Sequence, residues 1–130
     1  MKVVDKSKVL VVDDESMIVR LFQMILSASM PGVTIDTAAN GLDAFDKFRA
    51  NHYAVILMDL HMPIMDGQRA FSEIDKYCQQ NDWEMPAIIF CTGFVASDTI
   101  RSIIGTSGKH CLFTKPVRGD TLVDAVKARL

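Results

Sequence analysis

The fold is decided by the stretch KVLVVDDES, residues 8–16, in which an apolar run meets three acidic residues. A short apolar run without alternation is typical of a strand that is covered on both faces. Asp13, Asp14 and Glu15 follow it at once, and carboxylates this close repel one another and are poorly solvated beside an apolar strand end. The stretch therefore predicts a buried strand whose carboxyl end meets a cation or a set of hydrogen-bond donors.

Further apolar runs recur along the chain, and a segment with helical spacing follows each of them. The expected strands cover 8–12, 33–38, 54–58, 87–91 and 110–114. Apolar stripes mark the expected helices over 17–26, 41–50, 68–78, 97–104 and 120–130, with Asn40 and Ser97 as N-caps. Strict alternation of strands and helices requires right-handed crossovers. The sequence thus predicts an α/β fold, a (βα)5 doubly wound parallel sheet with helices on both faces.

Length and composition limit the class of protein. The chain has 130 residues, 49% hydrophobic and 23% charged, which suits one globular domain over 1–130 with a core from about residue 8. The formal net charge of -2 provides no basic field for a nucleic-acid backbone, so direct DNA binding is not expected. The charged N-terminus and the lack of a long apolar run predict neither signal peptide nor membrane span, which favours the cytoplasm.

The cysteines and two of the histidines indicate no site of their own. Cys78, Cys91 and Cys111 are odd in number and lack the spacing of zinc ligands, which argues against both a disulfide framework and a zinc site. We expect all three to be buried as small hydrophobic residues. The sequence suggests no partner for His52 or His110, and we assign them no role.

Polar side chains follow four of the expected strands, where such a sheet places its functional groups. Asp13 and Asp14 follow the first strand, Asp59 ends the third, Thr92 the fourth, and Lys115 follows the fifth. We expect these carboxylates, hydroxyl and amine to meet at one edge of the sheet. A small site with only oxygen ligands suits a hard divalent ion, and Mg²⁺ is the usual one.

From about residue 8 to residue 130 the chain resembles the receiver domain of two-component response regulators. The resemblance rests on four motifs in the same order at strand ends: DD at 13–14, DLHMPIMDG at 59–67, TG at 92–93 and KP at 115–116. It implies a flavodoxin-like sheet with strand order 2-1-3-4-5 and a cis peptide bond before Pro116. Within the second motif we expect Pro63 to fix φ and Gly67 to be free to take a positive φ, so that this loop presents His61.

The resemblance also implies the chemistry of the site. Asp59 would accept a phosphoryl group from a histidine kinase or a histidine phosphotransfer protein, as in a phosphorelay, and form an aspartyl phosphate. Asp13, Asp14 and Asp59 would bind Mg²⁺ together with the backbone carbonyl of His61. The domain would catalyse only its own phosphorylation and dephosphorylation. We therefore expect a signalling switch with no other substrate.

Further residues carry the expected switch. Thr92 and Lys115 would each bond one phosphoryl oxygen. Most members of the family have an aromatic ring three residues before this lysine, and this ring swings inward on phosphorylation; here the residue is Leu112. We expect the switch to act through Thr92 and Leu112. In the family, the side chains at the positions of His61 and Phe94 flank the approach of the hydrolytic water. We therefore expect these two residues to tune the rate at which the phosphoryl group is lost.

The expected output surface is formed by the fourth helix, the fifth strand and the fifth helix. In the active state Leu112 would pack against Ile100, Ile103 and Ile104, and a partner or a second copy of the chain would bind the resulting face. The cognate kinase, the output and the oligomeric state are left open. We expect either a stand-alone regulator or a receiver from a longer protein.

Three alternatives stay open on the residues alone. A Mg²⁺-dependent aspartyl phosphohydrolase with a similar sheet needs a second aspartate two residues after the nucleophile, where this chain has His61. A degenerate receiver would serve only for docking, although all four motifs are present. A flavodoxin-like cofactor binder needs a Ser/Thr/Gly-rich phosphate loop after the first strand, where this chain has acids.

Overall fold

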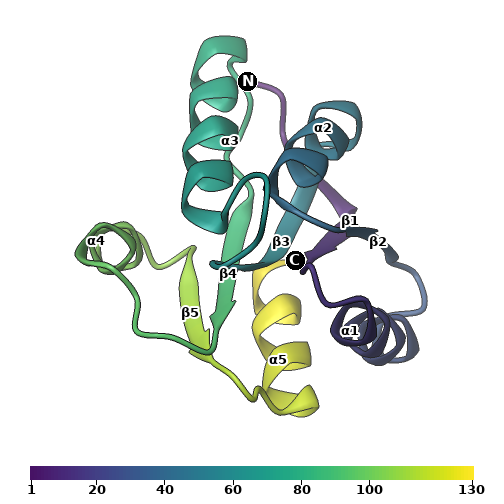
Figure 1. The fold of residues 1–130 in the computed structure, drawn as a ribbon. Helices are drawn as coiled ribbons and strands as arrows, with labels where there is room; N and C mark the ends of the chain where they lie inside the picture. The colour runs from purple at the N-terminus through teal and green to yellow at the C-terminus, as the bar shows by residue number, and fades with distance from the viewer.

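Strands and helices alternate along the whole chain in the computed structural model, which describes residues 1–130. The strands are β1 (Asp5–Val12), β2 (Thr34–Ala38), β3 (Tyr53–Asp59), β4 (Ala87–Thr92) and β5 (Cys111–Thr114). The helices are α1 (Ser16–Ser29), α2 (Gly41–Asn51), α3 (Gly67–Asn81), α4 (Asp98–Gly105) and α5 (Gly119–Arg129). All strand pairs are parallel, in the order β2-β1-β3-β4-β5, so the expected fold and strand order are confirmed (Figure 1).

Helices cover both faces of the sheet because successive side chains of each strand point to opposite faces. Figure 1 shows α1 and α5 together on one side and α2 and α3 on the other. Phe48, Phe71 and Ile100 belong to the core on the side of α2, α3 and α4. Leu26 and Val126 belong to the core on the side of α1 and α5. The central strand β3 is buried along its full length, as a strand between two helical layers should be. No helix of this chain is long and apolar enough to cross a membrane.

Side-chain caps set the start of two helices at the positions expected from the sequence. The Asn40 side chain accepts a hydrogen bond from the backbone N–H of Asp43 (2.9 Å), and the Ser97 hydroxyl accepts one from the backbone N–H of Ile100 (3.2 Å). Each bond satisfies a backbone donor that has no partner within the helix. These caps define where α2 and α4 begin.

The apolar stripe of the first helix is only partly buried, and one cysteine is less buried than expected. Met17 and Leu21 belong to the apolar stripe of the first helix, yet they are 82% and 51% exposed. The stripe is wider than the contact between α1 and the rest of the core, which uses Val19, Phe22 and Leu26. Cys78 and Cys91 are buried as expected, but Cys111 is only half-buried because β5 is an edge strand.

The two histidines without an expected role are buried and have partners. The Nε2 atom of His52 lies 2.8 Å from the carbonyl oxygen of Glu84. The Nδ1 atom of His110 accepts a hydrogen bond from the backbone N–H of Ile88 (3.0 Å). Burial and the nearby charge of Lys109 lower the pKa of His110 to about 4. His110 is therefore a neutral acceptor that joins the start of β5 to β4.

Candidate functional site

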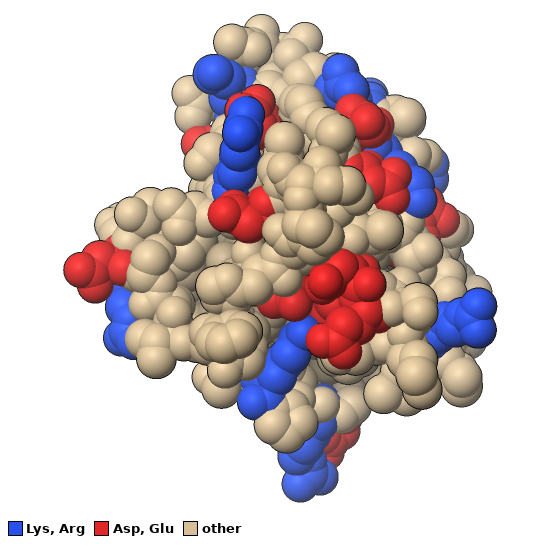
Figure 2. Space-filling model, viewed as in Figure 1, with Lys and Arg blue, Asp and Glu red and all other residues tan.

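The carboxyl ends of β1 and β3 bring three aspartates together. Asp13 and Asp14 follow β1 directly, and Asp59 is the last residue of β3, its neighbour in the sheet. One carboxylate oxygen from each residue lies within 4.8 Å of the others. Asp13 and Asp59 are buried, whereas Asp14 is exposed. Figure 2 shows acidic side chains gathered near the centre of this face, with a basic side chain beside them.

Lys115 supplies positive charge to this cluster from the loop after β5. Its Nζ atom donates hydrogen bonds to Oδ2 of Asp13 (2.8 Å) and to Oδ2 of Asp59 (3.2 Å). The peptide bond between Lys115 and Pro116 is cis, as the resemblance implied. Burial lowers the pKa of Lys115, but the hydrogen bonds and charges of the two carboxylates outweigh burial and raise the pKa above its ordinary value. The ammonium group therefore remains charged.

The donor set of the three aspartates is compatible with Mg²⁺. Their ligand atoms are all carboxylate oxygens, the type that hard divalent cations prefer. When ionised, Asp13, Asp14 and Asp59 carry three negative charges, and Lys115 balances one of them. Two negative charges remain, which a divalent ion would neutralise.

Two short loops cover the site beyond the ends of β3 and β4. The backbone N–H of His61 donates to Oδ1 of Asp59 (3.2 Å). The Thr92 side chain is fully buried, and its hydroxyl oxygen accepts a hydrogen bond from the backbone N–H of Phe94 (3.2 Å). The rings of His61 and Phe94 meet edge to face, with centroids 4.7 Å apart. The sequence indicated both positions but gave no sign of this contact.

The expected switch residues lie on β4 and β5, which pair along the edge of the sheet. The backbone N–H of Lys115 donates to the carbonyl oxygen of Thr92 (2.8 Å) and so joins the ends of these strands. Leu112 is half-buried and packs against the same core as Ile100 of α4. Phe113 points to the opposite face and packs against the core below α1 and α5. Leu112 therefore lies on the side of the sheet that α4 covers.

The loop after Asp59 differs from expectation in the residue that has a positive φ. Gly67 does not have one; the positive φ of the loop, 72°, is found at Ile64. Gly67 is required for a different reason, since a Cβ atom there would lie 2.3 Å from the backbone oxygen of Asp59. Asp66 caps α3 by accepting from the backbone N–H of Arg69 (2.8 Å). The start of α3 is thus packed directly against the end of β3.

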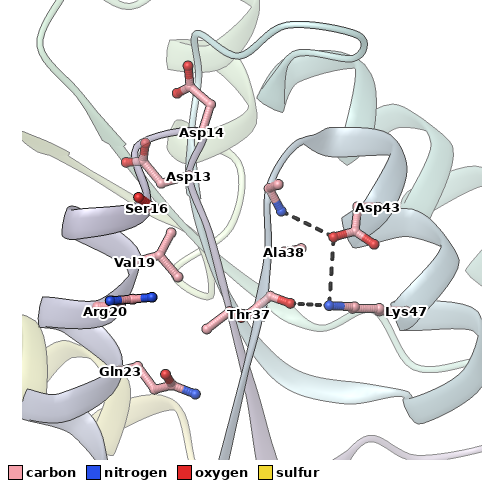
Figure 3. Close-up of a pocket in the computed structure, with 11 residues that line it drawn as sticks. Asp13, Asp14, Ser16, Val19, Arg20, Gln23, Thr37, Ala38, Asp43 and Lys47 are labelled. Atoms are coloured by element: carbon pink, nitrogen blue, oxygen red, sulfur yellow. Dashed lines mark hydrogen bonds and ion pairs between the residues drawn. The ribbon is translucent and has the colours of Figure 1, made fainter.

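A cavity of about 340 Å³ opens beside the acidic cluster, between α1, α2 and the edge strand β2 (Figure 3). On its floor, side chains from both helices bond the outer edge of β2. Gln23 donates to the carbonyl oxygen of Ile35 (2.8 Å), and Lys47 donates to that of Thr37. The Asp43 carboxylate accepts a hydrogen bond from the backbone N–H of Ala39, just after the strand (3.1 Å), and lies 3.7 Å from the Lys47 ammonium. Figure 3 shows Lys47 between Thr37 and Asp43.

An exposed apolar surface on α1 lies next to the site. It comprises Met17, Leu21 and Met24, which are 82%, 51% and 67% exposed. A groove of about 350 Å³ continues this surface toward the candidate site, and its lining residues are Ile18, Leu21, Phe22, Lys115, Pro116 and Val117. Helical spacing alone could not separate this surface from the buried stripe, because both repeat with the same period.

Comparisons with known proteins identify the domain to which this geometry belongs. The family model of the response regulator receiver domain matches residues 9–127. A protein-glutamate methylesterase/protein-glutamine glutaminase of Aliivibrio fischeri is 44% identical over 71 residues, which are 55% of this chain and 19% of that protein. Transcriptional regulatory protein SrrA of Staphylococcus aureus is 37% identical over 73 residues, 56% of this chain and 30% of that protein.

A solved structure extends the similarity to almost the whole fold. The chemotaxis protein CheY4 of Vibrio cholerae superimposes with a TM-score of 0.74 at 26% sequence identity, over 95% of this chain and 98% of that protein. By contrast, the matches span only 19% and 30% of the two relatives above. The similarity to those two proteins therefore covers a minor part of each.

Proposed function

The chain belongs to the response regulator receiver family, a family of signalling domains of two-component systems, and we propose that Asp59 is its phosphoacceptor in a Mg²⁺-dependent reaction. One observation carries this proposal. The Asp59 carboxylate lies at a strand end beside the oxygens of Asp13 and Asp14, and Lys115 donates a hydrogen bond to it. A nucleophilic carboxylate, acidic groups that suit a cation and a fixed ammonium are the parts that phosphoryl transfer requires.

The transfer follows from these parts. A carboxylate oxygen of Asp59 forms a bond to phosphorus while the bond from phosphorus to the donor's histidine nitrogen breaks, and the imidazole leaves. Lys115 is then within reach of a phosphoryl oxygen and offsets its charge. Asp13, Asp14, Asp59 and the backbone carbonyl of His61 would hold Mg²⁺. When bound, this ion supplies the positive charge that lets a phosphoryl group approach three carboxylates.

The aspartyl phosphate would act on Thr92 first. Its hydroxyl, which accepts from the backbone N–H of Phe94, would turn to donate its proton to a phosphoryl oxygen. Leu112 would then repack on the α4 side of the sheet and change the surface formed by α4, β5 and α5. An output partner or a second copy of the chain would read that surface. His61 and Phe94 would limit the access of water and so set the lifetime of the phosphoryl group.

The exposed surface on α1 supports a protein as the phosphoryl donor. Receiver domains interact with histidine kinases or histidine phosphotransfer proteins, and any donor must bring its phosphohistidine to Asp59. The apolar groove beside α1 is lined at one end by Lys115, which itself contacts Asp59. A donor that packs on Met17 and Leu21 would therefore reach the site. Burial of these two exposed side chains would favour the complex.

Intact-mass measurement tests the phosphoacceptor. Acetyl phosphate with Mg²⁺ should add one phosphoryl group to the wild-type chain, none to Asp59→Asn, and almost none in excess EDTA. Asp124→Asn, which changes an exposed aspartate of α5 outside the site, should label like the wild type. Equal labelling of Asp59→Asn and wild type, or full labelling in EDTA, would refute the proposal.

A further inference from the structure

Four residues at the ends of β3 and β4 and in the loops that follow form a continuous series of contacts beside the site. His61 donates its backbone N–H to the Asp59 carboxylate (3.2 Å), and its ring meets the ring of Phe94 (4.7 Å between centroids). Phe94 donates its own backbone N–H to the Thr92 hydroxyl (3.2 Å). Each ring therefore belongs to a residue whose backbone N–H bonds a group that phosphorylation would change: the Asp59 carboxylate for His61 and the Thr92 hydroxyl for Phe94. The phosphoacceptor and the threonine are joined through this aromatic pair.

The pair is placed where it can respond to the site. Phe94 is 68% exposed, so its ring lies outside the core, and it meets the ring of the exposed residue His61 edge to face. Thr92 is completely buried, and a side-chain rotation that carries its hydroxyl oxygen toward Asp59 would release the backbone N–H of Phe94. A phosphoryl group on Asp59 also changes the carboxylate that the backbone N–H of His61 bonds. Both ends of the pair therefore lose or change a hydrogen bond in the same event.

The other side of Thr92 lacks such an aromatic group. Leu112 of β5 is aliphatic and half-buried, and it has no polar atom with which to hold an alternative position. We propose that the contact between the His61 and Phe94 rings is the aromatic element of this switch and couples occupancy of Asp59 to the loop that leads into α4. This inference rests on the proposed phosphorylation of Asp59.

A second set of contacts connects the pair to α4. Ser97, which caps α4, also donates its hydroxyl to the side-chain oxygen of Gln68 at the start of α3 (3.1 Å). A cavity of about 180 Å³ lies between these two helix starts, and His61, Gln68, Val95 and Ser97 are among its lining residues. Space is therefore available into which the loop can move. Displacement of Phe94 would shift Val95 and, through Ser97, the N-terminus of α4.

Beryllofluoride with Mg²⁺, a phosphoryl mimic, tests the coupling by amide chemical shifts. In the wild type, the mimic should shift resonances at the site and across residues 95–104. Phe94→Ala should keep the shifts at Asp59 but lose at least half of those across 95–104. His61→Ala should lose a similar share of the shifts across 95–104, measured relative to its own shifts at Asp59. The double variant should lose no more than the stronger single variant, because both remove one contact. Val3→Ala, which changes a 66% exposed residue of the N-terminal segment outside these contacts, should behave like the wild type.

Full shifts across 95–104 in both ring variants would overturn the coupling. If the mimic does not shift the amide resonance of Asp59 in the wild type, the result counts against the proposed function instead. The ring contact is then tested by a comparison of variants without the mimic. In the unliganded chain His61→Ala should move the resonances of Thr92 and Phe94, whereas Val3→Ala should leave the Thr92 resonance in place. Unmoved Thr92 and Phe94 resonances in His61→Ala would refute the inference independently of phosphorylation.

Discussion

Lys115 lies closer to Asp13 than to the proposed phosphoacceptor: its Nζ atom is 2.8 Å from Oδ2 of Asp13, against 3.2 Å to Oδ2 of Asp59. The ammonium group therefore donates a hydrogen bond to a carboxylate oxygen of a proposed Mg²⁺ ligand. A cation that binds there competes with Lys115 for the same negative charge. Metal binding should consequently free Lys115 to turn toward a phosphoryl oxygen.

Replacing Lys115 should separate metal binding from phosphorylation. Lys115→Met removes the competing positive charge, so isothermal titration calorimetry should show Mg²⁺ binding about 5- to 10-fold tighter, the size expected of one partly buried ion pair. The rate of labelling by acetyl phosphate should fall by roughly 100-fold, because the transferred group loses a charge-assisted hydrogen bond. Lys109→Met, which alters a lysine paired with Glu84, should change neither quantity. Weaker Mg²⁺ binding by Lys115→Met would contradict this view of the site.

Replacing Gly67 with alanine should destabilise the chain although alanine favours helices. The added Cβ would lie 2.3 Å from the backbone oxygen of Asp59, and backbone atoms cannot move aside as a flexible side chain can. Urea denaturation should show a loss of about 2–3 kcal/mol in the free energy of unfolding. Gly105→Ala at the end of α4, where no atom lies within 4 Å of the new Cβ, is the matched control and should change it little. Equal stability of the two variants would mean that α3 can shift away from Asp59.

Ile64→Asn should stabilise the chain. Ile64 has φ 72°, a region that is unfavourable for β-branched residues and that asparagine tolerates better. Its side chain is 75% exposed, so little packing is lost. We expect a gain of about 1 kcal/mol in the free energy of unfolding, measured by denaturant titration. Val95→Asn changes an exposed β-branched residue without a positive φ and should bring no gain. A gain of the same size there would mean that the replacement of an exposed apolar side chain by an amide stabilises the chain, and not the relief of backbone strain.

His110 should make stability depend on pH below neutrality. Its pKa in the folded chain, about 4, is below its ordinary value of 6.5, so the unfolded chain takes up the proton first as pH falls. The contribution of neutral His110 to the free energy of unfolding is complete above about pH 6.5 and is lost progressively as the pH falls toward about 4. Between about pH 7.5 and pH 5, the wild type should lose about 2 kcal/mol more unfolding free energy than His110→Gln, whose side chain does not titrate. Parallel pH profiles of the two proteins would show that His110 is protonated without cost.

The sequence predicted those parts of the site that depend on strand ends. Asp13, Asp59, Thr92 and Lys115 each follow an apolar run, and parallel strands that alternate with helices must end at the same edge. The expected carboxylate cluster and the position of Lys115 therefore needed no knowledge of loop conformation. The structure brings these groups together, and their roles in phosphoryl transfer remain the predictions made above.

What the sequence did not reveal depends on contacts between segments that are distant in the chain. The ring contact of His61 with Phe94 joins two loops whose conformations no local pattern specifies. Gly67 was assigned a positive φ from its turn motif, whereas its real constraint is the nearby backbone of Asp59, and Ile64 adopts the positive φ instead. The exposure of Met17 likewise depends on how far the core extends beneath α1, which helical periodicity does not encode.

The side chains that bond the outer edge of β2 also affect how this protein behaves at high concentration. An uncovered edge strand invites a strand from another molecule, and repeated additions of this kind build fibres. Here Gln23 and Lys47 occupy the outward carbonyl groups, and Asp43 holds the next outward N–H. A foreign strand would have to displace these three side chains to bond the same carbonyl and N–H groups. The α1 and α2 helices thus protect this side of the sheet against aggregation, and its opposite edge, β5, is the short strand of four residues.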